Sequence, residues 1–427
     1  MLDWVLQLDK SWVAIIIIIV TLIAFIIDRI TIAVTALLSA LAFYLLGTTG
    51  PESVYAGFAS TVVMLVFGMM IVGDALFQTG LVLYIGNKIV KSRFVQNELS
   101  LIILLMLVTG SLSAFLSNTA TMATFIPLVG AIAAKSGGRI RNKNLLMPIA
   151  LAASIGGTMT LVGSTPQPLV NNVLESYDFA PIGLFDFALL AGPCFILLIL
   201  YVAFIGYRVQ NKTFDFSDEA SSDVPQGEEI AISGKTWIAG LTMLFCIVSF
   251  VSGLFPIGIT AIIGAAIVLA TRCVDFKPCM QRIDWNTILL LVFAQGIAAG
   301  MNDSGAGRML ADGAVALIGD NFWILYAASI LLTVLLTNLM SNTATAAMMA
   351  PIFIQIAATL GYDPYAFALA IAVASNVATA TPIGAVAMSQ VLVGGYRFKD
   401  YLVSGLPITI IMAIFLCLWG PVVLSTG

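Results

Sequence analysis

Two identical five-residue segments of polar and small residues stand out in this sequence. Residues 117–121 read SNTAT and recur letter for letter at 341–345, and a hydroxyl residue, Ser113 or Thr337, precedes each copy by four positions. The oxygens of Ser, Thr and Asn can ligate a hard cation, and their hydroxyl and amide groups can donate hydrogen bonds to an anion. The repetition therefore predicts one polar binding site that is built from two corresponding halves.

Glycine and proline interrupt the apolar sequence that follows each copy. Residues 163–168 read GSTPQP and residues 378–384 read ATATPIG. These residues free backbone carbonyls and amides in the middle of a hydrophobic segment. Carbonyl oxygens together with Ser, Thr and Asn suit sodium, whereas helix N-termini suit a carboxylate. The alternative is a proline kink that holds no ligand.

The polar segments also have a purely structural interpretation. Ser, Asn and Thr are favoured N-cap residues, so each SNT could serve only to begin a buried helix. A single copy would not distinguish capping from binding. Two copies at matching points of two apolar halves favour binding.

The composition places these segments in a membrane. Hydrophobic residues make up 60% of the 427 positions and charged residues 9%, against about 25% charged in an average soluble domain. Continuous apolar runs predict an all-α polytopic membrane protein and exclude a transmembrane barrel. The absence of histidine and the scattered positions of the five cysteines remove the usual nucleophilic triads and zinc sites, so we do not expect an enzyme.

The apolar runs divide into two series with the same order. Each series contains three spans, a hairpin that carries SNTAT near its middle, and two further spans. We place the first series at 12–27, 30–47, 60–78, hairpin 98–135, 145–175 and 184–208, and the second at 236–252, 254–272, 286–303, hairpin 321–360, 365–392 and 402–424.

Each series crosses the membrane an odd number of times, so the second series has the opposite orientation in the membrane. The sequence thus predicts two inverted repeats of five transmembrane helices, at 1–208 and 236–427, joined by a polar cytoplasmic linker at 209–235. Polar backbone in mid-membrane must be buried or line a cavity, so we expect both hairpins, 98–135 and 321–360, to be re-entrant.

Basic residues orient this layout. Only Lys10 and Arg308 of the 18 Lys and Arg residues fall on one side, and the other sixteen fall on the opposite side. The positive-inside rule makes the richer side cytoplasmic, so both termini are expected outside an inner (cytoplasmic) membrane.

The paired SNT motifs, each followed by an interrupted span, resemble the divalent-anion:sodium symporter (DASS) family of di- and tricarboxylate transporters, in the ion transporter superfamily. The resemblance covers almost the whole chain. It implies an elevator-type transporter with a dimeric scaffold, so we expect a homodimer. Relative to this family the sequence shows no additional N-terminal helix, in agreement with an outside N-terminus.

Carried over position by position, the resemblance implies a substrate site and two sodium sites. The substrate carboxylates would contact Asn118, Thr119, Ser164, Asn342, Thr343 and Thr381. One sodium ion would be held by Ser113, Ser117, Asn118 and the Gly163 carbonyl, and the other by Thr337, Asn342 and the carbonyls of Met340 and Ala380. The chain departs from the family at one point. In the family, Pro-Pro-Asn commonly follows the Ser or Thr, whereas here Thr-Pro-Gln follows Ser164 and Pro-Ile-Gly follows Thr381.

The implied function is sodium-coupled symport of a C4-dicarboxylate such as succinate, malate or fumarate, or of a related tricarboxylate. No Lys or Arg stands near either SNT in the sequence, so helix dipoles and bound cations are expected to balance the dianion. No nucleic acid is expected as a partner. For Asp74, near the end of its span, packing or capping is favoured over proton transfer.

Three other transport modes fit the same architecture. They are dicarboxylate exchange, permeation of sulfate or another oxyanion, and sodium/proton antiport. Antiport needs a buried acid at the interrupted spans, and none stands in 156–168 or 378–384. An intramembrane aspartyl protease would need two facing aspartates, and the order of Asp74 and Asp363 does not match that class.

Overall fold

The computed structural model describes residues 9–27, 29–90, 97–136, 139–214 and 233–424. All regular structure in these ranges is helical. Of the predicted linker, residues 215–232 lie outside the described part of the chain.

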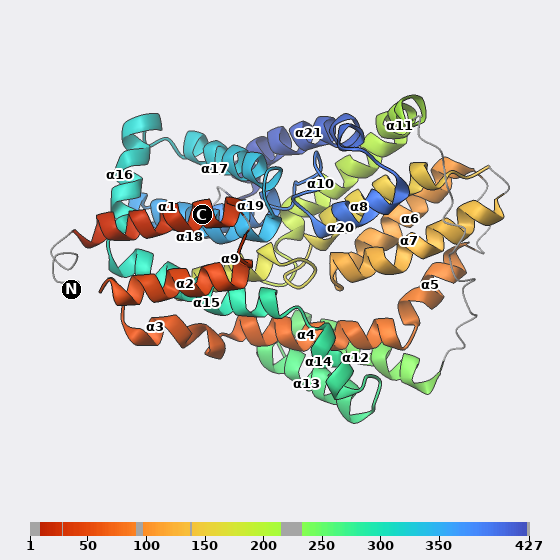
Figure 1. The fold of residues 1–427 in the computed structure, drawn as a ribbon, viewed down its shortest axis with the longest axis horizontal. Coiled ribbons are helices and arrows are strands. Elements are labelled where there is room, and N and C mark those ends of the chain that lie inside the picture. Colours follow the sequence, from red (N-terminus) through yellow and green to blue (C-terminus); the bar gives the residue numbers. More distant parts are fainter. Residues whose placement is uncertain (1–8, 28, 91–96, 137–138, 215–232, 425–427) are drawn as a thin grey trace.

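The first half contains α1 to α11 (Figure 1). Their bounds are α1 Lys10–Ile27, α2 Ile32–Leu45, α3 Pro51–Tyr55 with η2 Ala56–Ala59, α4 Thr61–Gln78, α5 Leu81–Val90, α6 Glu98–Ser113, α7 Asn118–Lys135, α8 Asn142–Gly157, α9 Pro166–Ser176, α10 Ala188–Tyr201, the π-helical turn η3 Val202–Gly206 and α11 Tyr207–Thr213.

The second half contains α12 to α21. Their bounds are α12 Gly234–Ser252, α13 Ile257–Ala270, α14 Phe276–Arg282, α15 Trp285–Asp303, α16 Ala306–Ile318, α17 Phe322–Thr337, α18 Asn342–Leu360, α19 Pro364–Ala374, α20 Val386–Gln390 with η4 Val391–Gly394, and α21 Phe398–Leu424.

Polar side chains begin many of these helices. Ser60 accepts hydrogen bonds from the first N–H groups of α4, and Asn97 and Asn321 do the same for α6 and α17. Ser233 forms a reciprocal capping box with Thr236 at the start of α12. Such caps satisfy amides that have no partner within the helix, so they locate helix starts between apolar runs.

Two of the long apolar runs break in their middle. The chain leaves helical geometry between α8 and α9, at 158–165, and between α19 and α20, at 375–385. Both breaks lie next to a helical hairpin, α6–α7 in one half and α17–α18 in the other. The hairpin tips at 114–117 and 338–341 are short.

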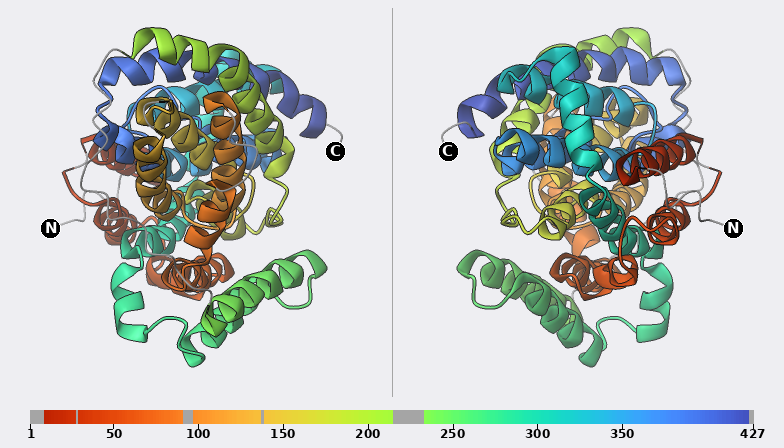
Figure 2. Two further views of the ribbon diagram at one scale, coloured as in Figure 1. Left: turned by 90° about the vertical axis from the view of Figure 1, so that its right-hand side faces the viewer. Right: turned by 90° about the vertical axis from the view of Figure 1, so that its left-hand side faces the viewer.

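The broken helices occupy the centre of the molecule. Every residue of α8 is buried, as are nine residues of α9 and nine of α19. Figure 1 places α8, α9, α18 and α19 between a layer with α4, α12 and α13 and a layer with α10, α17 and α21. In Figure 2, α12 and α13 extend away from this body at one edge, where they pack against α4.

The all-helical polytopic fold is confirmed. Seven described helical stretches are long and apolar enough to cross a membrane: α1, α4, α10 to α11, α12, α15, α18 and α21. Six of the ten spans that the sequence predicted are among these seven, and the seventh, α18, lies in the predicted hairpin 321–360. The other four predicted spans are missing for two reasons. The two broken runs are divided into shorter pieces, and α2 and α13 have 14 residues each, which rise about 21 Å in a hydrocarbon core of about 30 Å. The inverted arrangement and the re-entrant hairpins stay predictions.

Candidate substrate and cation site

The two polar segments form the tips of the two helical hairpins. The hydroxyl oxygens of Ser117 and Ser341 accept hydrogen bonds from the N–H groups of Ala120 and Ala344, at 3.1 and 3.2 Å. Each serine is thus the N-cap of a long helix, α7 or α18. The capping interpretation therefore accounts for the serines, while the Asn and Thr that follow lie in the first turn, at the positive end of the helix dipole.

The side chain of Asn118 lies among oxygen atoms. The Ser113 hydroxyl is 2.5 Å from its terminal amide atom, and the carbonyls of Gly163 and Ala153 are 3.1 and 3.2 Å from the same atom. The break after α8 makes this approach possible. A Cβ on Gly163 would lie 2.6 Å from the Ser113 carbonyl and 2.3 Å from that of Gly157, so only glycine fits there.

Asn342 has the same surroundings in the second half. Its terminal amide atom lies 2.9 Å from the Thr337 hydroxyl, 2.7 Å from the Gly384 carbonyl and 3.1 Å from the Ser375 carbonyl. A Cβ on Gly384 would lie 2.1 Å from the Thr337 carbonyl. Glycine again lets the broken segment reach the hairpin tip.

The carbonyls beside Asn342 are those of Gly384 and Ser375. The family resemblance implied the carbonyls of Met340 and Ala380 as sodium ligands, and this assignment stays a prediction. The N–H of Ala380 donates to the side chain of Asn338, at 3.0 Å. The bend of residues 375–385 around the tip, which depends on tertiary packing, selects the carbonyls.

An amide among carbonyl oxygens has two ways to be satisfied. It can turn its nitrogen toward them and donate, or it can present its oxygen to a cation that all these oxygens ligate. Oxygens that face one another without a hydrogen or a cation between them are unfavourable. The side-chain amides of Asn118 and Asn342 can therefore change partners. The amide nitrogen binds carbonyls in one state, and the amide oxygen binds a cation in the other.

A second pair of matching contacts ties each broken segment to its tip. Thr160 donates to the carbonyl of Ala114, and Thr381 donates to the carbonyl of Asn338, at 2.8 Å. Each threonine oxygen also accepts from the N–H two residues further on, at 3.3 and 3.4 Å. A glycine follows each threonine at the third position.

This match shows which residue of the first break corresponds to Thr381. Thr160 is the structural counterpart of Thr381, because both bind the tip carbonyl. Thr381 is buried at 6% exposure behind the tip, whereas Ser164 faces a cavity. The two breaks contain similar threonine and proline sequences, but these do not occupy equivalent positions in the structure. Only the packing of the breaks reveals this offset.

The cavity has a volume of 730 Å³ and lies between the hairpin tips, the two breaks and the helices α4 and α15. Of the predicted site residues, seven line it: Ser117, Asn118, Thr119, Gly163, Ser164, Asn342 and Thr343. The other five are buried: Ser113, Thr337, Met340, Ala380 and Thr381.

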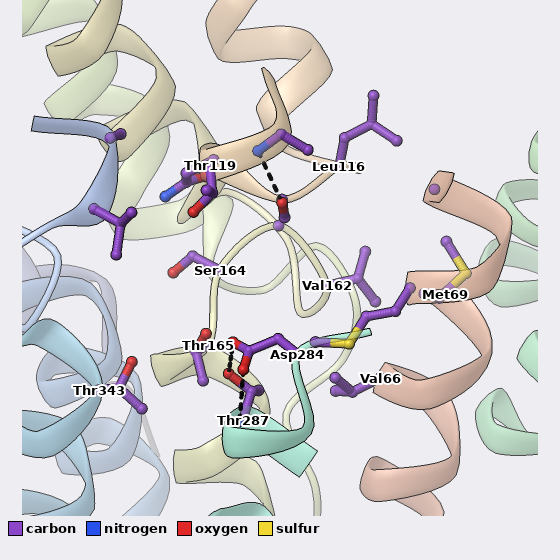
Figure 3. Close-up of a pocket in the computed structure, with 18 of the residues that line it drawn as sticks. Val66, Met69, Leu116, Thr119, Val162, Ser164, Thr165, Asp284, Thr287 and Thr343 are labelled. Atoms are coloured by element: carbon purple, nitrogen blue, oxygen red, sulfur yellow. Dashed lines mark hydrogen bonds between the residues drawn. The ribbon is translucent and has the colours of Figure 1, made fainter. Parts of the chain in front are cut away.

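Figure 3 shows how the polar groups face this cavity. Thr119 of α7, Ser164 of the first break and Thr343 of α18 lie along one side of the view, and Val66 and Met69 of α4 lie on the other. The cavity thus has a polar wall from the two hairpins and an apolar wall from α4. This pairing suits a small anion with a hydrocarbon body.

The Ser164 side chain is fixed by hydrogen bonds to two buried amides. Neither amide is among the site residues predicted from the sequence. The Ser164 hydroxyl lies 2.7 Å from Oε1 of Gln167 and 2.8 Å from Oδ1 of Asn376. Both amide side chains are buried. Gln167 stands where the sequence departs from the family pattern, which was the available sign of its importance.

Charged residues also line the cavity, contrary to the expectation drawn from the sequence around each SNT. They are Asp74 at the end of α4, Arg282 at the end of α14 and Asp284 before α15. Arg282 lies far from both motifs in the sequence, so no local pattern pointed to it.

The two tips differ in exposure although their sequences are identical. Ser117 and Thr119 are exposed, whereas Ser341 and Thr343 are half-buried. Asn118 is half-buried, whereas Asn342 is 7% exposed. The cavity continues from the first tip along α7 to Thr124 and along α4 to Gln78. It therefore extends toward the base of the α6–α7 hairpin.

Comparison with known proteins places the chain among transporters. The citrate transporter family matches residues 22–372 and 288–426. An uncharacterized transporter of Haemophilus influenzae is 31% identical over 377 residues, which cover 83% of this chain and 79% of that protein. The sodium-dependent high-affinity dicarboxylate transporter 3 of Caenorhabditis elegans is 25% identical over 82% of this chain and 72% of its own length.

Among solved structures, the YdaH transporter of Alcanivorax borkumensis has a similar fold. The two superpose with a TM-score of 0.64 at 19% identity and cover 88% of each chain. The likeness supports the helical transporter fold, and substrate specificity does not follow from it.

Proposed function

The chain belongs to the citrate transporter family, and on this premise we propose that it is a secondary transporter that moves a C4-dicarboxylate or a related tricarboxylate into the cell with sodium. One observation carries the proposal. Two helix N-termini, each with Asn and Thr in its first turn, meet at one cavity.

The anion would bind between the two tips. The N-termini of α7 and α18 supply partial positive charge, and Thr119 and Thr343 supply hydroxyl donors. Ser164, whose hydroxyl lies against the oxygens of Gln167 and Asn376, would turn to donate to the anion. A dicarboxylate has a charged group at each end and an apolar centre, which matches two polar tips and the apolar wall of α4. Asn118 and Asn342 would contact its carboxylates.

Sodium would bind in the two oxygen clusters behind the tips. Neutral hydroxyl, amide and carbonyl oxygens are the ligands that a singly charged hard cation accepts. A cation at Asn118 turns the amide oxygen inward and leaves the amide nitrogen free for the anion. The same rotation at Asn342 would couple the second cation to substrate binding.

The transport cycle is proposed from the same two halves. Inverted repeats of five spans, with α6–α7 and α17–α18 as re-entrant hairpins, would allow the cavity to open alternately to either side in an elevator motion within a homodimer. The orientation proposed from the basic residues places both termini outside the inner membrane. The cavity would then open to the cytoplasm, on the side of the α6–α7 base.

Uptake by proteoliposomes tests this function. Labelled succinate, malate, fumarate, citrate and sulfate are offered with sodium outside, with potassium outside, with a proton gradient, or with an anion inside for exchange. We expect sodium-dependent uptake of a dicarboxylate. Equal uptake without sodium would refute symport, and uptake that requires internal anion would identify an exchanger.

Two variants and a control connect the activity to the site. Asn118→Ala and Asn342→Ala should each reduce uptake by at least tenfold, while Asn302→Ala, at an exposed position outside the cavity, should leave it unchanged. Normal uptake by both site variants would refute the proposed site.

A further inference from the structure

Arg282 and Asp74 form a two-pronged ion pair on the cavity wall. Nε and Nη2 of Arg282 donate to the two carboxylate oxygens of Asp74, each at 2.7 Å. The Arg282 side chain is 40% exposed and that of Asp74 is 12% exposed. The hydrogen bond to Asp74 raises the pKa of Arg282, so the arginine stays charged at every physiological pH.

The remaining charge on the wall has its own partner. Asp284 accepts from the N–H groups of Asn286 and Thr287 and, at 2.6 Å, from the Thr287 hydroxyl, and so caps α15. Its negative charge lies at the positive end of that helix. Among the described residues that line the cavity, Arg282 is the one cation, and Asp74 is the carboxylate that neutralises it.

Stability alone does not explain this pair. Water screens the Arg282 end of the pair, which is 40% exposed, and two side chains must be ordered to form it, so its contribution to folding is small. The start of α15, directly after α14, is also attached to α4 by an aromatic contact between Trp285 and Phe67, with ring centroids 6.1 Å apart. A charge pair at the wall of an anion site acts instead through its field in the cavity.

We propose that Arg282 and Asp74 together set the electrostatic potential of the cavity and thereby its affinity for the anion. The inference rests on the proposed anion transport. Arg282 attracts the anion into the cavity, and Asp74 weakens this attraction so that the anion can leave again. A site that held the anion more tightly in this state would release it more slowly and lower the transport rate.

The two single variants should change affinity in opposite directions. Asp74→Asn removes the compensating charge, so KM for succinate should fall about three- to tenfold and the maximal rate should fall as well. Arg282→Gln leaves Asp74 uncompensated, so KM should rise by a similar factor. The double variant should return KM to within about twofold of the wild-type value. The differences in KM between the single variants and the wild type should shrink at high salt.

A structural role makes a different prediction. If the pair only fixed α14 to α4, both single variants would lose the same contact and shift KM in the same direction. A same-direction shift, or no shift, would overturn the proposal. If the wild-type protein transports none of the anions offered, the proposed function fails, and the charge effect is decided by the following measurement.

Thiol chemistry measures the potential without any substrate. Ala123 lines the cavity from α7 at an exposed position, so Ala123→Cys introduces a thiol there. The purified full-length protein is treated with an anionic and a cationic methanethiosulfonate of similar size, and native cysteines are subtracted with the same protein lacking the new thiol. The ratio of anionic to cationic rates should rise about threefold or more with Asp74→Asn and fall with Arg282→Gln.

Thr359→Cys provides the matched control. Thr359 is exposed near the end of α18 and does not line the cavity, so its rate ratio should not respond to either charge variant. Unchanged ratios at position 123, or equal changes at both positions, would overturn the proposal whatever the transport assay gives.

Discussion

The hydroxyl of Ser60 donates a 2.7 Å hydrogen bond to the side-chain oxygen of Asn172, which joins the start of α4 to the middle of α9. Gln295 of α15 donates to the same oxygen at 2.8 Å, and the Asn172 nitrogen donates to the Leu291 carbonyl at 2.7 Å. Asn172 is fully buried. One amide thus ties the first broken segment to both α4 and α15.

Replacing this amide should loosen the contact between those helices. Asn172→Ala removes the oxygen that Ser60 and Gln295 share and the amide that donates to the Leu291 carbonyl, while Ser60 keeps its contact with Glu175 at 3.3 Å. We expect the free energy of unfolding to fall by about 1–3 kcal/mol. Denaturation in detergent, followed by tryptophan fluorescence, measures the change. Asn302→Ala serves as the exposed control, and equal stability of the two variants would contradict this role for Asn172.

The glycines of the two breaks should be irreplaceable for transport. Gly163→Ala and Gly384→Ala place a methyl group within 2.3 Å of a backbone oxygen, so each break must move away from its tip. We expect sodium-dependent uptake to fall at least tenfold. Gly313→Ala in α16, whose Cβ would meet open space, should retain full uptake. Normal transport by the break variants would show that the clusters around Asn118 and Asn342 are not needed.

The two hydroxyls behind the tips should determine sodium affinity. Ser113 and Thr337 are both fully buried and lie against the Asn118 and Asn342 amides. Ser113→Ala and Thr337→Ala should each raise the sodium concentration for half-maximal uptake about tenfold, which is the scale of one lost bond to a charged group. Thr337→Ser keeps the oxygen and should restore most of the affinity. An unchanged sodium dependence in both alanine variants would rule out cation binding there.

Gln167 should act on the substrate through Ser164. Ser164→Ala removes a hydroxyl on the cavity wall and should raise KM for the anion about tenfold, since a buried hydrogen bond to a charged group is lost. Gln167→Leu should have a similar effect, because it removes the oxygen to which the Ser164 hydroxyl donates and so the contact that fixes the position of the Ser164 side chain. The double variant should be no worse than either single one, since both changes remove one interaction. Additive losses would show that Gln167 acts independently.

Much of the architecture follows from local sequence. Apolar runs and the caps at Ser60, Asn97 and Asn321 indicate where helices begin and end, because a cap acts over three or four residues. The SNTAT copies place Ser117 and Ser341 at the starts of α7 and α18 in the same way. The resemblance that these motifs carried led to the family that the comparisons show.

The site required contacts between segments that are distant in the sequence. Arg282 reaches the cavity because α14 packs beside α4, and nothing near either motif indicates this. The correspondence of Thr381 with Thr160 appears only when both hydroxyls are seen to bind tip carbonyls. Hydrogen bonds of this kind depend on how the two breaks pack against the hairpins. The local sequence does not reveal this packing.

The sequence by itself thus determined the long apolar helices and the two polar tips, because these depend on neighbours along the chain. Only the tertiary structure decided that each residue of the first tip is more exposed than its counterpart in the second, although both read SNT. Identical local sequence leads to identical local geometry. Both tips line the cavity, and the packing around each one then determines how much of it is exposed there.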